Sequence, residues 1–249
     1  MTDQSIPSFT TTLAVEAHKL RRSLALLLAA VAPGLIAVFV FFNQLRMENP
    51  MPWATALKSS GGIWAFFMLP MCVTALTALV AQTEHGPRSW DHLRALPLPR
   101  WHLYAAKALC VLGVVVGMSL WLALLVAFAV QAAGWWNSSA TASGTPDIVG
   151  YLLLLGRIFM AAWLMIALQL WVALRQSSFV PALGLGIAGT FFAVVAPSAK
   201  IGVVLPWQIP VNQLASDPAR ADLTLGLGCI GGAFMFTVMC WRMSQREVS

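Results

Sequence analysis

The sequence predicts an all-α, polytopic membrane protein with six transmembrane helices, an N-terminal amphipathic interfacial helix and a short cytoplasmic helix. Three observations support this fold class. Hydrophobic residues make up 59% of the 249 residues, and charged residues only 10%. Soluble domains are about 25% charged. The mean hydropathy is +0.78, and the apolar residues gather in long uninterrupted stretches. This composition excludes soluble, disordered and disulfide-scaffold proteins.

Six apolar stretches define a transmembrane domain over residues 24–241. A helix needs about 20 apolar residues to cross the hydrocarbon core of a bilayer. Because lipid offers no hydrogen-bond partners, each stretch is expected to satisfy its backbone as a helix. The predicted spans are Leu24–Phe42, Ile63–Ala81, Ala105–Val130, Tyr151–Leu174, Phe179–Ala196 and Leu223–Trp241.

Residues 1–23 precede the first span and are predicted to form a cytoplasmic tail and an amphipathic interfacial helix. Leu13, Ala17 and Leu20 recur at helical spacing. The charged residues Glu16, Lys19 and Arg22 fall elsewhere on the helical wheel. We therefore expect a helix on the inner membrane surface with its cations near anionic lipid headgroups. The alternative is a plain cytoplasmic tail whose charges only set orientation.

The loop of residues 82–104, between the second and third spans, carries the strongest local pattern. Gly86 breaks the preceding helix, and Pro87 suits the first position of a new one. Pro97 and Pro99 end that helix, which leaves about two amphipathic turns over Arg88–Leu96. Such a helix can anchor on the membrane surface or dock into a groove of a soluble partner. The composition alone does not separate these two possibilities.

The distribution of positive charge predicts the orientation. If the N-terminus is cytoplasmic, two thirds of the 15 lysines and arginines fall in segments on the inner side. Cytoplasmic loops are enriched in these residues. Both termini are therefore expected in the cytoplasm, with residues 242–249 as a second tail and residues 197–222 outside. Since the positive charge is explained in this way, no nucleic-acid partner is expected.

The loop residues resemble those of a known family. Glu84, the run Trp90–Leu93, the run Leu96–Arg100 and Lys107 together resemble the loop of ABC type-2 permeases. The resemblance is nearest to the small permeases of lantibiotic and bacitracin immunity transporters. A basic amphipathic start and a first span containing Pro33 are similar too.

The resemblance implies half of an exporter. Such a permease pairs with a second copy or a homologous permease, and it engages a separate ATP-binding subunit that holds ATP and Mg²⁺. The chain itself is then expected to bind no cofactor. The helix between spans two and three would be the coupling helix, and residues 197–222 would form an outer re-entrant segment. The ATPase-coupling residues carried over are Glu84, Arg88, Trp90, Leu93, Pro97 and Arg100.

No catalytic, cofactor-binding or metal-ligating residue is assigned. The sequence contains no P-loop motif, so we expect no ATP hydrolysis by this chain. The central parts of the six stretches lack ionisable side chains, which disfavours an ion-coupled secondary transporter or a channel. The leading hypothesis is the permease subunit of an ATP-driven exporter in a bacterial inner membrane, with a hydrophobic or amphipathic substrate such as a peptide or a lipid-like molecule. The alternative is a membrane scaffold or immunity protein that transports nothing.

Several glycine patterns lie within the predicted spans. The G-x-G-x-x-G runs at 184–189 and 226–231 match a dinucleotide-binding pattern, but they lack its strand–turn–helix context. We expect them to serve close helix packing. The pairs Gly113/Gly117 and Gly228/Gly232 are expected to pack within the chain rather than between copies. Arg157, near the outer end of the fourth span, is expected to reach the headgroups.

Overall fold

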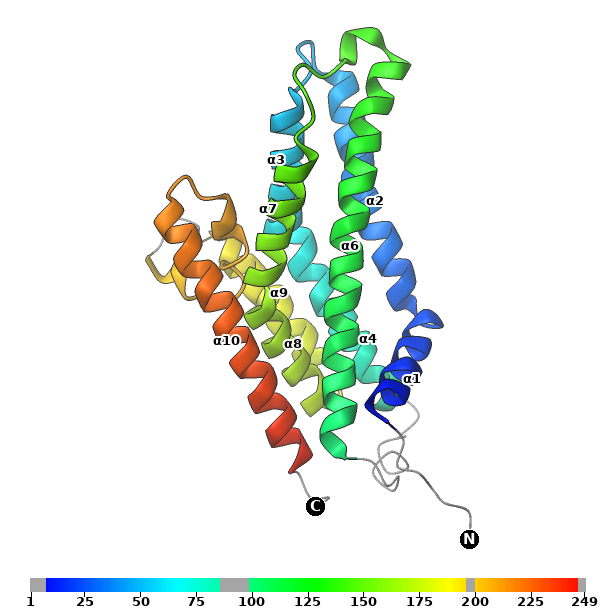
Figure 1. Ribbon diagram of the computed structural model, residues 1–249, viewed down its shortest axis with the longest axis vertical. Coiled ribbons are helices and arrows are strands. Elements are labelled where there is room, and N and C mark those ends of the chain that lie inside the picture. Colours follow the sequence, from blue (N-terminus) through cyan, green and yellow to red (C-terminus); the bar gives the residue numbers. More distant parts are fainter. Residues whose placement is uncertain (1–7, 86–98, 196–199, 246–249) are drawn as a thin grey trace.

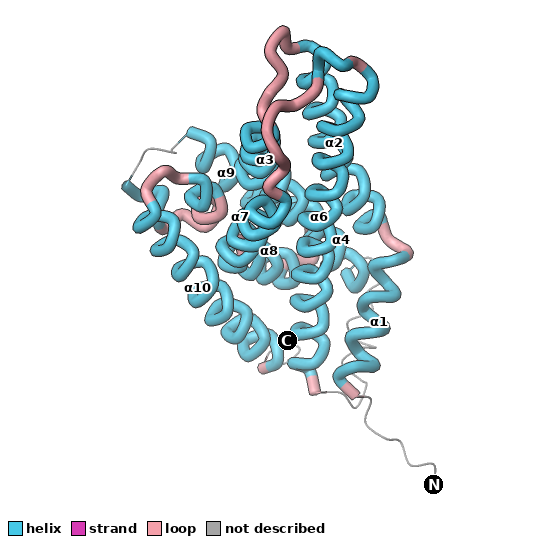
Figure 2. Tube along the Cα trace, turned by 45° about the horizontal axis from the view of Figure 1, so that its top comes forward, coloured by secondary structure: helices cyan, strands magenta, loops and turns pink. Residues whose placement is uncertain are grey.

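A computed structural model describes residues 8–85, 99–195 and 200–245, and within these ranges it contains helices and no strand. The helices form an elongated bundle (Figure 1). Helix α1 and the C-terminal end of α10 lie at one end of the bundle, and the α2–α3 and α6–α7 connections lie at the opposite end (Figures 1 and 2).

The N-terminal part forms two helices separated by a short break. Helix α1 spans Phe9–Arg21, and its N-cap Ser8 accepts a hydrogen bond from the backbone of Thr11. Helix α2 spans Leu24–Arg46, and its N-cap Ser23 accepts one from Ala25. Serine is a preferred N-cap residue because its hydroxyl satisfies a free backbone N–H group. Helix α1 therefore ends at Arg21, and Ser23 begins the long apolar helix α2.

The next two spans are long. Helix α3 (Trp53–Ile63), a π-helical turn (Trp64–Met68) and α4 (Leu69–His85) follow one another directly. Helix α6 covers Arg100–Trp136, 37 residues. At 1.5 Å per residue it is about 55 Å long, which exceeds the hydrocarbon thickness of about 30 Å. Helix α6 therefore extends beyond the hydrocarbon core.

The C-terminal half is less regular. Helices α7 (Ile148–Ala161) and α8 (Trp163–Arg175) meet at a bend of 44°. Helix α9 covers Val180–Val195 and α10 covers Pro218–Ser244. Short 3₁₀ turns occupy Ser138–Ala140, Lys200–Val203 and Val211–Leu214. Residues 200–217 connect α9 to α10 without a long helix, in the region predicted as the outer segment.

Among the described residues, four helical stretches are long and apolar enough to cross a membrane, and there are five if α7 and α8 count as one bent span. The four are α2, the continuous stretch from Trp53 to His85, α6 and α10. The predicted fourth span corresponds to the bent pair. The predicted fifth span corresponds to α9, whose 16 residues are fewer than the usual length of a spanning helix. Helix length alone therefore does not support six full-length spans.

The core lies along the contact between the long helices. Helix α2 packs along α6, and α10 packs against α8. Side chains with no exposed surface, such as Trp64, Leu122 and Met165, fill the interior. Large apolar side chains also lie outside, with Leu124 65% and Ile230 75% exposed. An apolar outer surface of this extent fits a lipid environment.

The glycine pairs behave differently from one another. A Cβ at Gly228 would collide with the backbone of Ala161, and one at Gly232 would collide with Trp163. This pair therefore packs within the chain, as predicted. A Cβ at Gly113 or Gly117 would meet nothing within 4 Å. The prediction of packing within the chain is wrong for that pair, because no neighbouring helix of the described chain covers that face of α6.

The G-x-G-x-x-G runs serve packing at some of their positions. A Cβ at Gly186 would collide with Thr74, and one at Gly189 with the ring of Trp207. Gly184 and Gly226 have open space instead. The close approach of α9 to α4 and to Trp207 explains two of the glycines.

Candidate functional site

Four charged side chains from α1, α4 and α6 meet in one place. Figure 1 shows α1 at one end of the bundle. Lys107 Nζ on α6 lies 2.6 Å from Glu16 Oε2 on α1 and 2.9 Å from Glu84 Oε1 on α4. Lys19 Nζ lies 2.8 Å from Glu16 Oε1 and 2.8 Å from Glu84 Oε1. We call these four residues the ion-pair cluster.

Three of the four residues of the ion-pair cluster are almost completely buried. Lys107 is 0% exposed, Glu84 1% and Glu16 4%. An isolated charge in such a place is strongly unfavourable, so each charge needs partners of the opposite sign. Two lysines and two glutamates alternate, so that their formal charges cancel. The cluster is therefore compatible with burial only while all three helices stay together.

The local sequence explains why these side chains point inward. On α1 the buried residues are Thr12, Glu16 and Leu20, spaced by four positions along one face. That face packs against α6. Lys107 lies on the buried face of α6, and Glu84 lies near the end of α4. Each of the three helices thus contributes one buried charge, and α1 adds the partly exposed Lys19.

Lys19 connects the cluster to the surface. Its side chain is 31% exposed while its ammonium group contacts both glutamates. Burial lowers the pKa of Lys19, but the hydrogen bonds and charges of Glu16 and Glu84 outweigh that effect, and its pKa lies above the ordinary value. Lys19 therefore stays protonated under physiological conditions.

Two of the six predicted coupling residues lie within the described part of the chain. Glu84 belongs to the cluster, and Arg100 is the exposed first residue of α6. The other four, together with the predicted Arg88–Leu96 helix, lie outside the described residues. They are Arg88, Trp90, Leu93 and Pro97.

Of the predicted interface residues, only Arg22 is exposed. Glu16 faces Lys107 instead of the headgroups, and Lys19 bridges the two glutamates. The helical wheel separated Glu16 from the apolar stripe, but it could not reveal that a charge on α6 lies opposite. The sequence signal for this contact was Lys107, a lysine within an apolar helix, because a charge there requires a partner of the opposite sign.

A second polar network lies at the α10 N-terminus. Arg157 on α7 forms an ion pair with Asp222, and its Nε donates to Gln213 Oε1 at 3.3 Å. Gln213 Nε2 donates to Thr224 Oγ1 and to the backbone oxygen of Ala221, both at 3.0 Å. Arg157 thus has protein partners and does not simply extend toward headgroups. The network joins α7 to the segment that precedes α10.

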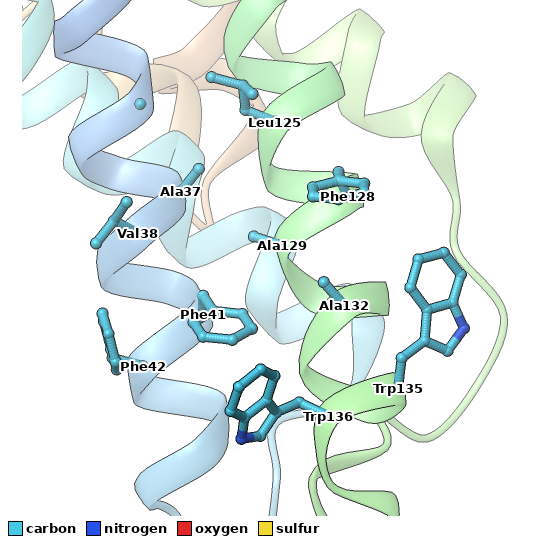
Figure 3. A pocket seen from close by; sticks show the side chains of 11 residues that line it. Ala37, Val38, Phe41, Phe42, Leu125, Phe128, Ala129, Ala132, Trp135 and Trp136 are labelled. Carbon is cyan, nitrogen blue, oxygen red and sulfur yellow. The ribbon is translucent and has the colours of Figure 1, made fainter.

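An apolar groove of about 630 Å³ lies between α2 and α6, toward the end opposite the ion-pair cluster. Figure 3 shows Phe41 and Phe42 of α2 on one side and Phe128, Trp135 and Trp136 of α6 on the other. The groove offers hydrocarbon and aromatic surface and scarcely any polar group. It can therefore contact only apolar molecules or the apolar part of an amphipathic one.

The described residues contain no group of three or more His, Cys, Asp or Glu side chains that could hold a metal ion. The chemistry that the ion-pair cluster offers is electrostatic: it fixes three helices to one another.

Comparison with known proteins identifies the family. A comparison with curated proteins gives no match. The family model described as ABC-2 family transporter protein matches residues 12–193. The match covers well over half of the chain, from α1 to α9, and includes the whole ion-pair cluster. Permeases of this family generally work with an ATP-binding subunit. Together with the long apolar helices, the match shows that this chain belongs to the ABC-2 family and is a multi-pass transporter permease.

Proposed function

We propose that this chain is the membrane subunit of an ATP-driven exporter, and that the ion-pair cluster transmits force from a separate ATPase to the transmembrane helices. The observation that carries the proposal is the ion pair between Glu84 and Lys107. Glu84 lies near the start of the 82–104 loop, which is the predicted contact with the ATPase, and Lys107 follows its end. A displacement of the loop would act on α4 and α6 together, and through Glu16 on α1.

The proposed topology has six crossings with both termini in the cytoplasm. Two features support it. Helix α1 and the end of α10 lie at the same end of the bundle (Figure 1), which requires an even number of crossings. The bent α7–α8 pair and the short α9 would then be the fourth and fifth crossings. The surplus of positive charge on the inner side favours a cytoplasmic location for α1, in a bacterial inner membrane.

The proposed partners are an ATP-binding subunit, which holds ATP and Mg²⁺, and a second permease, either a copy or a homologue. The proposed substrate is hydrophobic or amphipathic, either a peptide or a lipid-like molecule. The groove lined by Phe41, Phe128 and Trp136 supports this substrate class because its lining is apolar. Charged small solutes would find few partners along such a surface.

The test is the ATPase activity of the reconstituted complex of this chain with its ATP-binding subunit. Glu84→Gln removes one charge at the cluster. Arg157→Gln is the matched control, since it removes one charge at the second polar network. We expect Glu84→Gln to abolish the stimulation of ATP hydrolysis by substrate while the complex still assembles, and Arg157→Gln to leave stimulation intact.

Two results would contradict this proposal. If no ATP-binding subunit co-purifies with the chain, the alternative of a non-transporting scaffold or immunity protein is favoured. If Glu84→Gln and Arg157→Gln behave alike, the cluster has a structural role only.

A further inference from the structure

A second groove, of about 390 Å³, lies where α1, α2 and α6 meet. Leu13 and Ala17 of α1, Leu26 of α2 and Leu109 and Gly113 of α6 form its apolar lining. The groove is open, with Leu26 59% and Leu109 47% exposed. Gly113 contributes no side chain, and a Cβ there would meet nothing within 4 Å. The groove can therefore receive a hydrocarbon chain lying along α6.

One edge of this groove is cationic. Arg21 lines it, and Arg22 follows directly at the end of α1; both are exposed. Within residues 8–85, 99–195 and 200–245, neither side chain forms an ion pair or a hydrogen bond. The neighbouring Lys19 is occupied by Glu16 and Glu84. Two guanidinium groups thus remain available for an external anion, and guanidinium pairs well with phosphate.

We propose that this groove binds one anionic phospholipid of the inner leaflet. Its phosphate contacts Arg21 and Arg22, and one acyl chain lies against Leu26, Leu109 and Gly113. The arginines lie at the end of α1, and the apolar residues proposed to contact the acyl chain lie on α2 and α6. Since α2 and α6 lead away from α1 toward the middle of the bundle (Figure 1), a headgroup and an acyl chain would follow one another in the same order. Anionic lipids are concentrated in the cytoplasmic leaflet.

This inference rests on the proposed orientation of α1 toward the cytoplasm. It does not depend on coupling to an ATPase, because lipid binding is measured on the chain alone. The two proposals can therefore fail separately.

The experiment is native mass spectrometry of the full chain in detergent, with dioleoyl phosphatidylglycerol and dioleoyl phosphatidylcholine as probes. The two lipids share their acyl chains and differ in headgroup charge. We expect one retained phosphatidylglycerol and a preference for it over phosphatidylcholine. Since a basic residue near the surface contributes about 1 kcal/mol, Arg21→Gln and Arg22→Gln should each reduce that preference about fivefold.

The groove itself is tested by a matched pair of variants on α6. Gly113→Leu places a side chain in the groove and should reduce retention of both lipids. Gly117→Leu lies one turn farther along α6, where a Cβ also meets nothing within 4 Å, and should leave retention unchanged. Because the two arginine variants alter only exposed side chains, they test the proposal even if Gly113→Leu fails to fold.

Three outcomes would overturn the proposal. The first is equal retention of the two lipids by the unaltered chain. The second is an unchanged preference in both arginine variants. The third is a dimer that Gly113→Leu dissociates, which would make the groove a contact between two copies.

Discussion

Lys107 on α6 donates a hydrogen bond to Glu84 on α4 across 2.9 Å, although the two residues are 23 positions apart in the chain. The loop between them is thereby closed at its base by a buried ion pair. Glu16 on α1 completes the arrangement from the other side of Lys107. Moving the end of α4 away from α6 or α1 would therefore separate buried charges.

Lys107→Met should lower the free energy of unfolding by about 3–5 kcal/mol, because it leaves two buried glutamates without their main partner. Lys19→Met should lower it by only about 1 kcal/mol, since part of that side chain is in contact with solvent. Chemical denaturation of the purified chain in detergent, followed by tryptophan fluorescence, measures both values. Equal losses in the two variants would show that burial does not determine the strength of these pairs.

Gly228→Ala should destabilise the chain by about 1–3 kcal/mol, because the added methyl group collides with the Ala161 backbone and forces α10 away from its neighbours. Gly226→Ala is the matched control on the same helix, where the added Cβ has open space. Alanine is the better helix former, so this control should be neutral or slightly stabilising. Thermal unfolding of both variants in detergent provides the comparison, and a destabilised Gly226→Ala would contradict the packing argument.

Gln213→Ala should lower the free energy of unfolding by about 1–3 kcal/mol, because it removes a buried amide that hydrogen-bonds Ala221 and Thr224. Asp222→Asn weakens the ion pair with Arg157 and should change it by less than about 1 kcal/mol, since both side chains of that pair are substantially exposed. The same denaturation experiment measures both. A larger loss in Asp222→Asn than in Gln213→Ala would show that the ion pair, and not the buried amide, contributes most to the stability of this network.

Single cysteines should report the orientation of the chain. In a background without the four native cysteines, Ser138→Cys between α6 and α7 should react with a membrane-impermeant maleimide added to intact spheroplasts. Thr10→Cys on α1 and Gln245→Cys after α10 should react only after permeabilisation. All three native side chains are exposed, so access to the reagent should depend on the side of the membrane. Labelling of Thr10→Cys in intact spheroplasts would reverse the proposed orientation.

Much of the fold follows from local sequence. The positions of α2, α6 and α10 agree with the apolar runs that predict them, because hydrophobic length decides whether a helix spans a bilayer. The bend between Ala161 and Trp163 does not follow from the sequence, since no proline or glycine marks it. The shortness of α9 and the open face at Gly113 were also not evident, because both depend on which helices pack together.

The sequence by itself determined that this protein is helical and that it belongs in a membrane, and it predicted Glu84 and Lys107 near the two ends of the loop between the second and third spans. Composition and apolar length are local properties, and they need no partner. Only the tertiary structure decided that Glu16 and Lys19 join those two residues in one cluster and that Arg21 has no ion-pair partner among the residues that the structure describes. The periodicity of α1 defines its faces, but which charge lies opposite each face depends on how the helices pack.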